Sequence, residues 1–179
     1  TATSATRAIS WKVVDANSDG AGAATGTGST TLTVTAVNDA PSLSAAATAA
    51  YTENAAAAAL SSGFTLTDVD DVSVASATVS IGAGLSNTSD VLTAVTTGTS
   101  ITASYNTATG VLTLSGTDSK ANYQTVLQSV KYSSTSDDPT ATSATRAISW
   151  KVVDANSAGA GAGALTGTAS TTLTVTAVN

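Results

Sequence analysis

Acidic and amide side chains in this sequence gather in short runs that follow stretches of alternating apolar and small polar residues. The densest run is Asp68-Val69-Asp70-Asp71, and Asp137-Asp138 and Asn38-Asp39 lie just before the two prolines. Clustered carboxylates repel one another unless a cation lies among them, and Ca²⁺ takes about six to eight oxygens from carboxylates, amides and backbone carbonyls. The chemistry that these residues predict is therefore the coordination of Ca²⁺.

The composition excludes most kinds of active site. The 179 residues contain no His, no Cys and no Met, and only 10% are charged. The usual proton shuttles, thiol nucleophiles and zinc ligands are therefore absent. A glycosidase with two carboxylates needs none of these, but it needs a cleft, for which short connections leave little chain. We expect that the protein is not an enzyme.

The charge balance and the hydropathy pattern limit the partners. Twelve Asp and Glu stand against six Lys and Arg, so no basic stripe can form and nucleic acid is not an expected partner. No run of about eighteen apolar residues is present, so we expect no membrane span in this window, and any export signal is expected elsewhere in a longer chain. The absence of cysteine permits export, because bound calcium can supply the rigidity that disulfides supply in other exported proteins.

The chain repeats itself. Residues 1–18 and 140–157 share the same eighteen letters, TATSATRAISWKVVDANS, at an offset of 139 residues. The similarity continues through STTLTVTAVN, which ends at Asn38 and again at Asn179. Between these segments lies a Gly/Ala-rich stretch that is two residues longer in the second copy, as an exposed hairpin loop tolerates.

This offset divides the chain in two. We interpret residues 1–40 as the C-terminal strands and linker of an upstream repeat, and residues 41–179 as one nearly complete repeat. A tail of two or three strands is only marginally stable by itself. Its missing strands must lie upstream in a longer chain or be supplied by a neighbouring molecule.

Alternation of period two predicts an all-β fold. Ile148, Trp150 and Val152 share one apolar face, and in the last strand Leu173 and Val175 are expected to be buried. The intervening residues Thr172, Thr174 and Thr176 are expected to be exposed. A hairpin loop is predicted at 106–110, and one short inserted helix at 119–129, with Asp118 as a candidate N-cap.

Several motifs, in order, resemble those of the cadherin family. Thr52-Glu53-Asn54 resembles its Pro-Glu-Asn motif, and Thr67-Asp68-Val69-Asp70 resembles its Asp-x-Asp motif. Asp137-Asp138 stands where cadherins carry an acidic Asp-Arg-Glu segment, and Asp154 where they carry an Asp at a strand end. Val37-Asn38-Asp39-Ala40-Pro41 resembles the linker between domains.

Together these motifs are similar to the cadherin-like tandem repeats of very large bacterial adhesins. The likeness covers almost all of residues 41–179, although Ala36 stands where a cadherin linker begins with Asp. It implies immunoglobulin- or cadherin-like β-sandwich repeats in tandem, with Ca²⁺ as the cofactor. The implied ligands come from strand ends and the linker: Asp15, Asn38, Asp39, Glu53, Asp68, Asp70, Asp137, Asp138 and Asp154. We expect one ion site at the junction to bridge six of them, namely Asp15, Asn38, Asp39, Glu53, Asp68 and Asp70.

These features favour a stalk: a calcium-stiffened extender of a secreted bacterial adhesin that spaces a distal binding domain from the cell surface. Repeated units add length and contact only their neighbours, which are then the partners. One alternative is a repeat of an extracellular filament or matrix protein, in which other copies of the protein are also partners. Another is a carbohydrate-binding module, which needs exposed aromatic residues, and these make up only 4% of the chain. The expected location is extracellular, at the bacterial cell surface.

Overall fold

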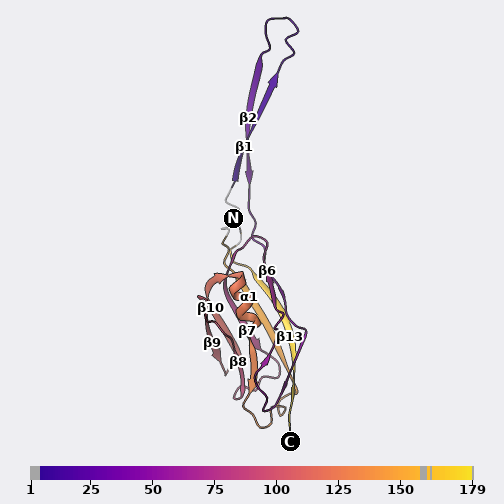
Figure 1. Ribbon diagram of the computed structural model, residues 1–179, viewed down its shortest axis with the longest axis vertical. Coiled ribbons are helices and arrows are strands. Elements are labelled where there is room, and N and C mark those ends of the chain that lie inside the picture. Colours follow the sequence, from indigo (N-terminus) through magenta and orange to yellow (C-terminus); the bar gives the residue numbers. More distant parts are fainter. Residues whose placement is uncertain (1–4, 158–160, 162, 179) are drawn as a thin grey trace.

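The fold is an all-β sandwich with one helix, preceded by a separate hairpin (Figure 1). The computed structural model describes residues 5–157, 161 and 163–178. Within these residues the elements, in chain order, are β1 (Ala5–Val14), β2 (Thr25–Val34), β3 (Ser42–Ser44), β4 (Thr48–Thr52), β5 (Ala58–Ala59), β6 (Thr65–Thr67), β7 (Ser73–Ile81), β8 (Asp90–Thr93), β9 (Thr102–Asn106), β10 (Val111–Ser119), α1 (Lys120–Gln128), β11 (Lys131–Ser134), β12 (Thr145–Asp154) and β13 (Thr166–Thr176).

The sandwich has one large layer and one composite layer. The large layer is a six-stranded sheet in the order β4-β13-β12-β7-β10-β9, in which β4 and β13 are parallel and the other pairs antiparallel. The sheets β5-β11-β8 and β3-β6, together with α1, supply the side chains of the opposite layer. We call residues 42–176, which contain both layers, the module.

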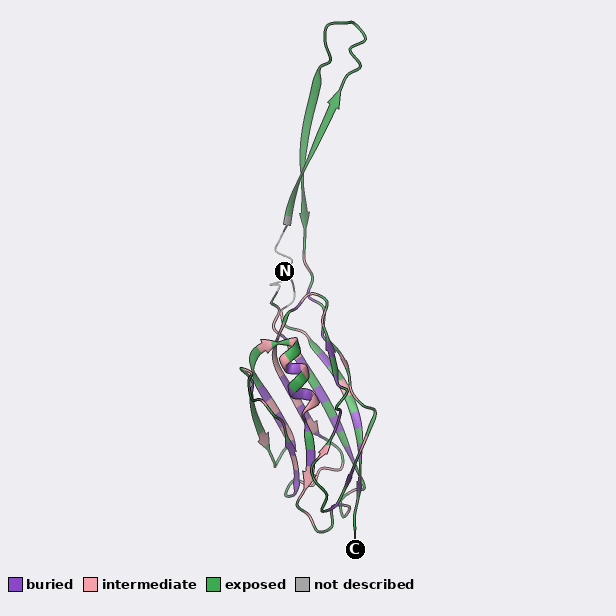
Figure 2. Cartoon of the chain, in the orientation of Figure 1, coloured by how far each residue is buried: buried purple, intermediate pink, exposed green. Residues whose placement is uncertain are grey.

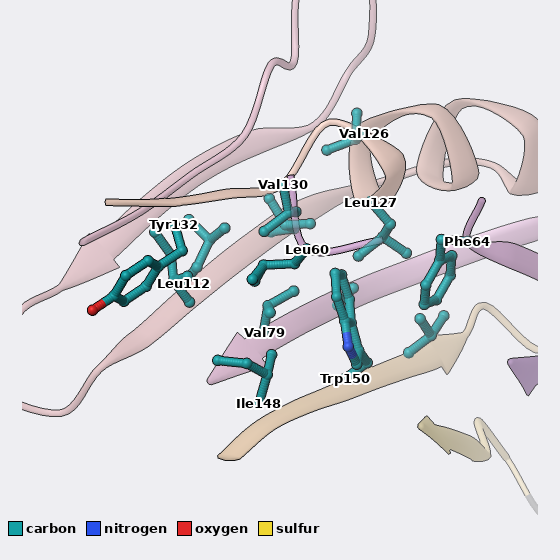
Figure 3. Close-up of a cluster of buried hydrophobic side chains, with 14 of the residues drawn as sticks. Leu60, Phe64, Val79, Leu112, Val126, Leu127, Val130, Tyr132, Ile148 and Trp150 are labelled. Carbon is teal, nitrogen blue, oxygen red and sulfur yellow. The ribbon is translucent and has the colours of Figure 1, made fainter. Parts of the chain in front are cut away.

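Trp150 lies in the middle of the module's core. Its side chain is fully buried, and its ring centroid lies 5.1 Å from that of Phe64. Figure 3 shows Trp150 and Ile148 on one strand, facing Leu127 of the helix and Leu60 of the opposite layer. The indole N–H donates to Thr171 Oγ1 at 3.0 Å, so the polar atom of this side chain is also satisfied inside the core.

The predicted alternation along the last two strands is confirmed. Leu173 and Val175 are buried, and the threonines at 172, 174 and 176 are exposed. On β12 the side chains of Ile148, Trp150 and Val152 are buried on one face, as period two requires.

The inserted helix is also confirmed, but its predicted cap is wrong by one residue. Ser119 is the N-cap, and its hydroxyl oxygen accepts from the backbone N–H of Asn122. The Asp118 carboxylate instead accepts from the backbone N–H of Ser100 and from Asn122 Nδ2. The loop expected at 106–110 joins β9 to β10, and Gly110 there has a positive φ of 68°.

A fully buried ion pair crosses the core. Arg146 Nε lies 2.6 Å from Asp90 Oδ2, and both side chains have no exposed surface. Asp90 Oδ1 accepts from the Tyr132 hydroxyl, and Arg146 Nη2 donates to the Pro139 carbonyl oxygen at 2.8 Å. Burial, together with this hydrogen bond to Asp90, raises the pKa of Tyr132, so the phenol keeps the proton that it donates. The pair ties β12 to β8 of the opposite layer.

The hairpin of β1 and β2 stands outside this core. The two strands form a sheet of two by themselves, and residues 6–34 are all exposed (Figure 2). Its register repeats that of β12 and β13: Trp11 pairs with Gly28 as Trp150 pairs with Ala169. Residues 6–14 and 145–153, which have the same sequence, are therefore paired in the same register, covered in one place and uncovered in the other.

The faces of β13 predict opposite effects for neighbouring substitutions. We expect Val175→Asp to unfold the module, because a carboxylate would enter the core without a partner, at a cost of several kcal/mol. Thr174→Asp, on the exposed face, should cost less than about 1 kcal/mol. Urea denaturation followed by circular dichroism compares the two variants, and equal losses of stability would contradict a strand with one buried face.

The buried ion pair supplies a second, internally controlled prediction. Arg146→Ala should destabilise the module by about 3–5 kcal/mol, because it leaves the Asp90 carboxylate buried without its counter-ion. Arg7→Ala lies in the same eighteen-residue sequence on the exposed hairpin and should change stability by no more than about 0.5 kcal/mol. The midpoints of thermal unfolding test both; a comparable loss in the Arg7 variant would show that the hairpin arginine is also in a buried pair.

Candidate metal centre

Three carboxylates converge in the turn between β6 and β7. Asp68, Asp70 and Asp71 each bring one oxygen within 4.8 Å of the others. The turn is shaped by Asp68 itself, because its Oδ1 accepts from the backbone N–H groups of Asp70 at 3.2 Å and Asp71 at 2.9 Å. One carboxylate thus fixes the backbone that presents the other two.

The linker before the module lies against this turn. The backbone N–H of Asp39 donates to Asp70 Oδ2 at 3.0 Å. Asn38 Nδ2 donates to Asp154 Oδ2 at 3.0 Å and to the Gly163 carbonyl oxygen at 2.9 Å. The linker is therefore held between the β6–β7 turn and the closing loop of the β12–β13 hairpin.

The closing loop also reaches the carboxylate turn directly. Both the backbone N–H and the hydroxyl of Ser157 donate to Asp71 Oδ1. Asp154, at the end of β12, is fully buried and accepts from the backbone N–H of Leu165 and of Asn156. Five acidic or amide residues, which we call the linker cluster, meet here: Asn38, Asp68, Asp70, Asp71 and Asp154.

Several oxygens of the linker cluster are buried without a donor. Asn38 is only 5% exposed, and its Oδ1 accepts no hydrogen bond from the described part of the chain. The same holds for Asp68 Oδ2 and Asp70 Oδ1. Buried oxygens without partners are rare and costly. A hard cation is the kind of ligand that would satisfy all three, because it binds carboxylate and amide oxygens.

A basic side chain at the start of α1 reaches the turn that carries Asp68. Lys120 comes close, but its ammonium donates to the backbone carbonyl oxygen of Asp68 at 2.5 Å rather than to a carboxylate. Burial raises the pKa of Asp68, the Asp70 carboxylate raises it further, and the backbone N–H groups of Asp71 and Asp70 partly offset the rise. Burial also acts on Asp70, but its interactions with the Asp68 carboxyl group and with the N–H of Asp39 outweigh it, so its pKa is lowered. Burial and the neighbouring Asp70 carboxylate thus disfavour the negative charge on Asp68, and a bound cation would offset both effects.

The other sequence-predicted ligands lie elsewhere. Asp15 begins the loop that joins β1 to β2 in the exposed hairpin, where its carboxylate accepts from the backbone N–H of Asn17. Glu53 lies at the opposite end of the module, because its Oε2 accepts from the backbone N–H of Val178 at 2.8 Å. The eleven residues of β13 separate that end from Leu165 beside Asp154, a span of roughly 35 Å. One ion within this chain cannot bridge the six residues expected to share it.

Asp137 and Asp138 form a third location. They lie in the turn before β12, where Asp138 accepts from the Thr140 hydroxyl at 3.2 Å. This turn is at the same end of the module as Glu53, because the start of β12 pairs with the end of β13. The structure thus brings together Asn38, Asp68, Asp70 and Asp154, with Asp39 contributing its backbone.

Two members of this region were not among the predicted ligands. Asp71 follows Asp70 directly in the sequence, so the run of acidic residues was a signal for it. Ser157 carried no such signal, because its contact with Asp71 joins residues 86 positions apart.

Comparison with known proteins gives one partial similarity. A stretch of 91 residues, 49% of the chain, is 40% identical to halomucin of Haloquadratum walsbyi (strain DSM 16790 / HBSQ001), and it covers 1% of the length of that protein. No family model matches the chain, and no solved structure matches it. The one described helix, α1, is too short to cross a membrane. The chain is therefore similar to a small segment of a much longer protein.

Proposed function

We propose that the chain is a calcium-stiffened spacer of an extracellular surface protein. The observation that carries the proposal is the attachment of the linker to the carboxylate turn: Asp39 donates to Asp70, and Asn38 donates to Asp154. A Ca²⁺ ion among the unpartnered oxygens of Asn38, Asp68 and Asp70 would tie the linker to the module more firmly. The similarity to a segment of halomucin supports a place in a long extracellular protein.

The shape of the chain supports a spacing role. The hairpin projects from one end of the module (Figure 1), and Val178, which donates to Glu53, lies at the other end. Units joined in this way add length along one axis and contact only their neighbours. The stiffness of such a rod depends on its linkers, because each module already has its own apolar core.

The aromatic residues give little support to carbohydrate binding. Five of the seven are buried in the core: Tyr51, Phe64, Tyr123, Tyr132 and Trp150. Tyr105 is partly buried and donates to the Asp90 carbonyl oxygen at 2.8 Å. Trp11 is the one aromatic residue with a largely exposed ring, and the matching Trp150 packs in the core. Sugar stacking needs exposed rings on the module, and the described module offers none of this kind.

Calorimetric titration of the 179-residue chain with CaCl₂ tests the metal site. Extracellular modules bind Ca²⁺ with a dissociation constant of about 10⁻⁴ to 10⁻³ M, and we expect binding in this range. Asp70→Asn should weaken it strongly, because Asp70 offers an unpartnered buried oxygen. Asp15→Asn is the matched control, because the hairpin tip lies away from the cluster, and it should leave binding unchanged.

The same titration followed by hydrogen exchange tests the stiffening. Calcium should slow hydrogen exchange of the Asp39 amide, which donates to Asp70. At a calcium concentration of about a hundred times the dissociation constant, binding should stabilise the form that holds the ion by about 2.7 kcal/mol. Exchange in the exposed hairpin, at residues 6–34, should not respond. Calcium heat without any change at Asp39 would separate binding from stiffening, and the absence of heat would exclude the proposed site.

A further inference from the structure

We propose that the uncovered face of the β1–β2 hairpin docks on a scaffold with the sequence of residues 41–139, supplied by a preceding copy of that segment in the same polypeptide. The inference deepens the proposed spacer role, on which it rests, by naming the partner of the hairpin. It stands on three observations: an uncovered apolar face, a covered face of the same sequence, and a polar group that only one kind of partner can satisfy.

The hairpin exposes side chains that are buried in the second copy. Trp11 is 59% exposed and Leu32 is 51% exposed, whereas their counterparts Trp150 and Leu173 are fully buried. The pairing is the same in both hairpins, because Arg7 lies opposite Leu32 as Arg146 lies opposite Leu173. A ribbon of two strands with one apolar face needs a cover to be stable, and in the second copy that cover is known.

The cover of the second hairpin comes from the segment between the two copies. β7 pairs with β12 on one side, and β4 pairs with β13 on the other. Phe64 packs against Trp150, and Asp90 pairs with Arg146. All of these partners lie between residues 41 and 139, so a segment of that sequence carries the complete complementary surface.

Arg7 restricts the choice of partner. In the second copy the equivalent Arg146 is buried only because Asp90 and the Pro139 carbonyl oxygen meet its guanidinium. Packing two β1–β2 hairpins face to face would bury Arg7 with no carboxylate opposite, and an unpaired buried charge is strongly unfavourable. A purely apolar partner would fail for the same reason.

Stoichiometry places the scaffold in the same polypeptide. In another copy of this chain the complementary surface is already filled by β12 and β13. If the β1–β2 hairpin docked there, it would displace the β12–β13 hairpin, which has an equivalent apolar face. The total buried apolar area would therefore not increase. A preceding segment that ends where residue 1 begins has no hairpin of its own, and the chain would continue through the join unaltered because residues 140–157 and 1–18 are identical.

Docking would also place the separated acidic groups near one another. Glu53 accepts from the N–H of Val178, and Val37 stands at the equivalent position of the first copy, one residue before Asn38. The glutamate of a preceding scaffold, at the position of Glu53, would therefore lie beside the linker. The two ends of successive modules, which one chain holds apart, would meet at Asn38 and Asp39.

The test is a longer chain in which residues 41–139 precede Thr1 and the whole 179-residue sequence follows. Residues 41–139 contain no tryptophan, so the difference between the parent and its Trp11→Phe variant isolates the emission of Trp11. We expect a shift of that emission to shorter wavelength and a several-fold lower acrylamide quenching constant than in the 179-residue chain. Both should appear in calcium and in chelator, because the face is apolar; a loss of calcium binding alone would leave them intact.

Arg7→Ala distinguishes docking in register from loose collapse. In the longer chain it should remove the unfolding transition of the added scaffold, whereas in the 179-residue chain it should change nothing. The conservative variant Arg7→Lys should retain part of the unfolding transition that Arg7→Ala removes. The proposal is overturned if Trp11 is as accessible to acrylamide in the longer chain as in the 179-residue chain. It is also overturned if the 179-residue chain buries Trp11 by self-association, which sedimentation would detect.

Discussion

The structure depends on one constraint: a hairpin with alternating apolar residues must have its apolar face covered. β12 and β13 meet this constraint by lying between β7 and β4 in the large sheet, which buries Trp150, Val152 and Leu173 completely. The strand order of the sheet meets this constraint, because β12 and β13, the last two strands of the module, lie between β4 and β7, which come much earlier in the sequence. The hairpin of β1 and β2 has the same pattern without the cover, and every residue of β2 is exposed. The same sequence therefore shows both what the constraint demands and what remains when it is unmet.

The buried pair of Arg146 and Asp90 adds specificity to this apolar packing. Burying an ion pair contributes little net stability, since desolvation offsets the attraction. Its value here is geometric: Arg146 Nε, Arg146 Nη2 and the Tyr132 hydroxyl all donate to the Asp90 carboxylate, so β12, β8 and β11 meet in only one register. A slip of β12 by one residue would turn Arg146 and Trp150 to solvent together. The apolar pattern determines which face of β12 is buried, and the ion pair determines the register of β12 along its length.

Local patterns in the sequence were sufficient for the fold class, the alternation of β12 and β13, and the inserted helix. They were not sufficient where a long-range contact decides the outcome. Asp90 follows a Ser-rich stretch typical of a turn, and only Arg146, 56 residues later, makes it a core residue. The helix cap differed because Ser119 and Asp118 are both good caps, and Ser100 competes for Asp118. For the acidic residues, strand-end position predicted which side chains lie at poles of the sandwich, but not at which pole, because that depends on strand direction across the whole module. Glu53 and Asp70 are therefore close in sequence and far apart in space.

The linker cluster and the core are coupled through the same hairpin. Asp154 and Ser157 belong to the end of β12 and its closing loop, and they contact Asn38 and Asp71. A module whose last hairpin is not docked would lack these contacts, so its core would be incomplete and the linker would keep only the hydrogen bond from Asp39 to Asp70. The turn of Asp68 is different, because hydrogen bonds between neighbouring residues hold it, from the N–H groups of Asp70 and Asp71 to the Asp68 carboxylate. The linker therefore has two anchors, one on the β6–β7 turn and one at the end of the last hairpin, and a cation at the cluster would join the two.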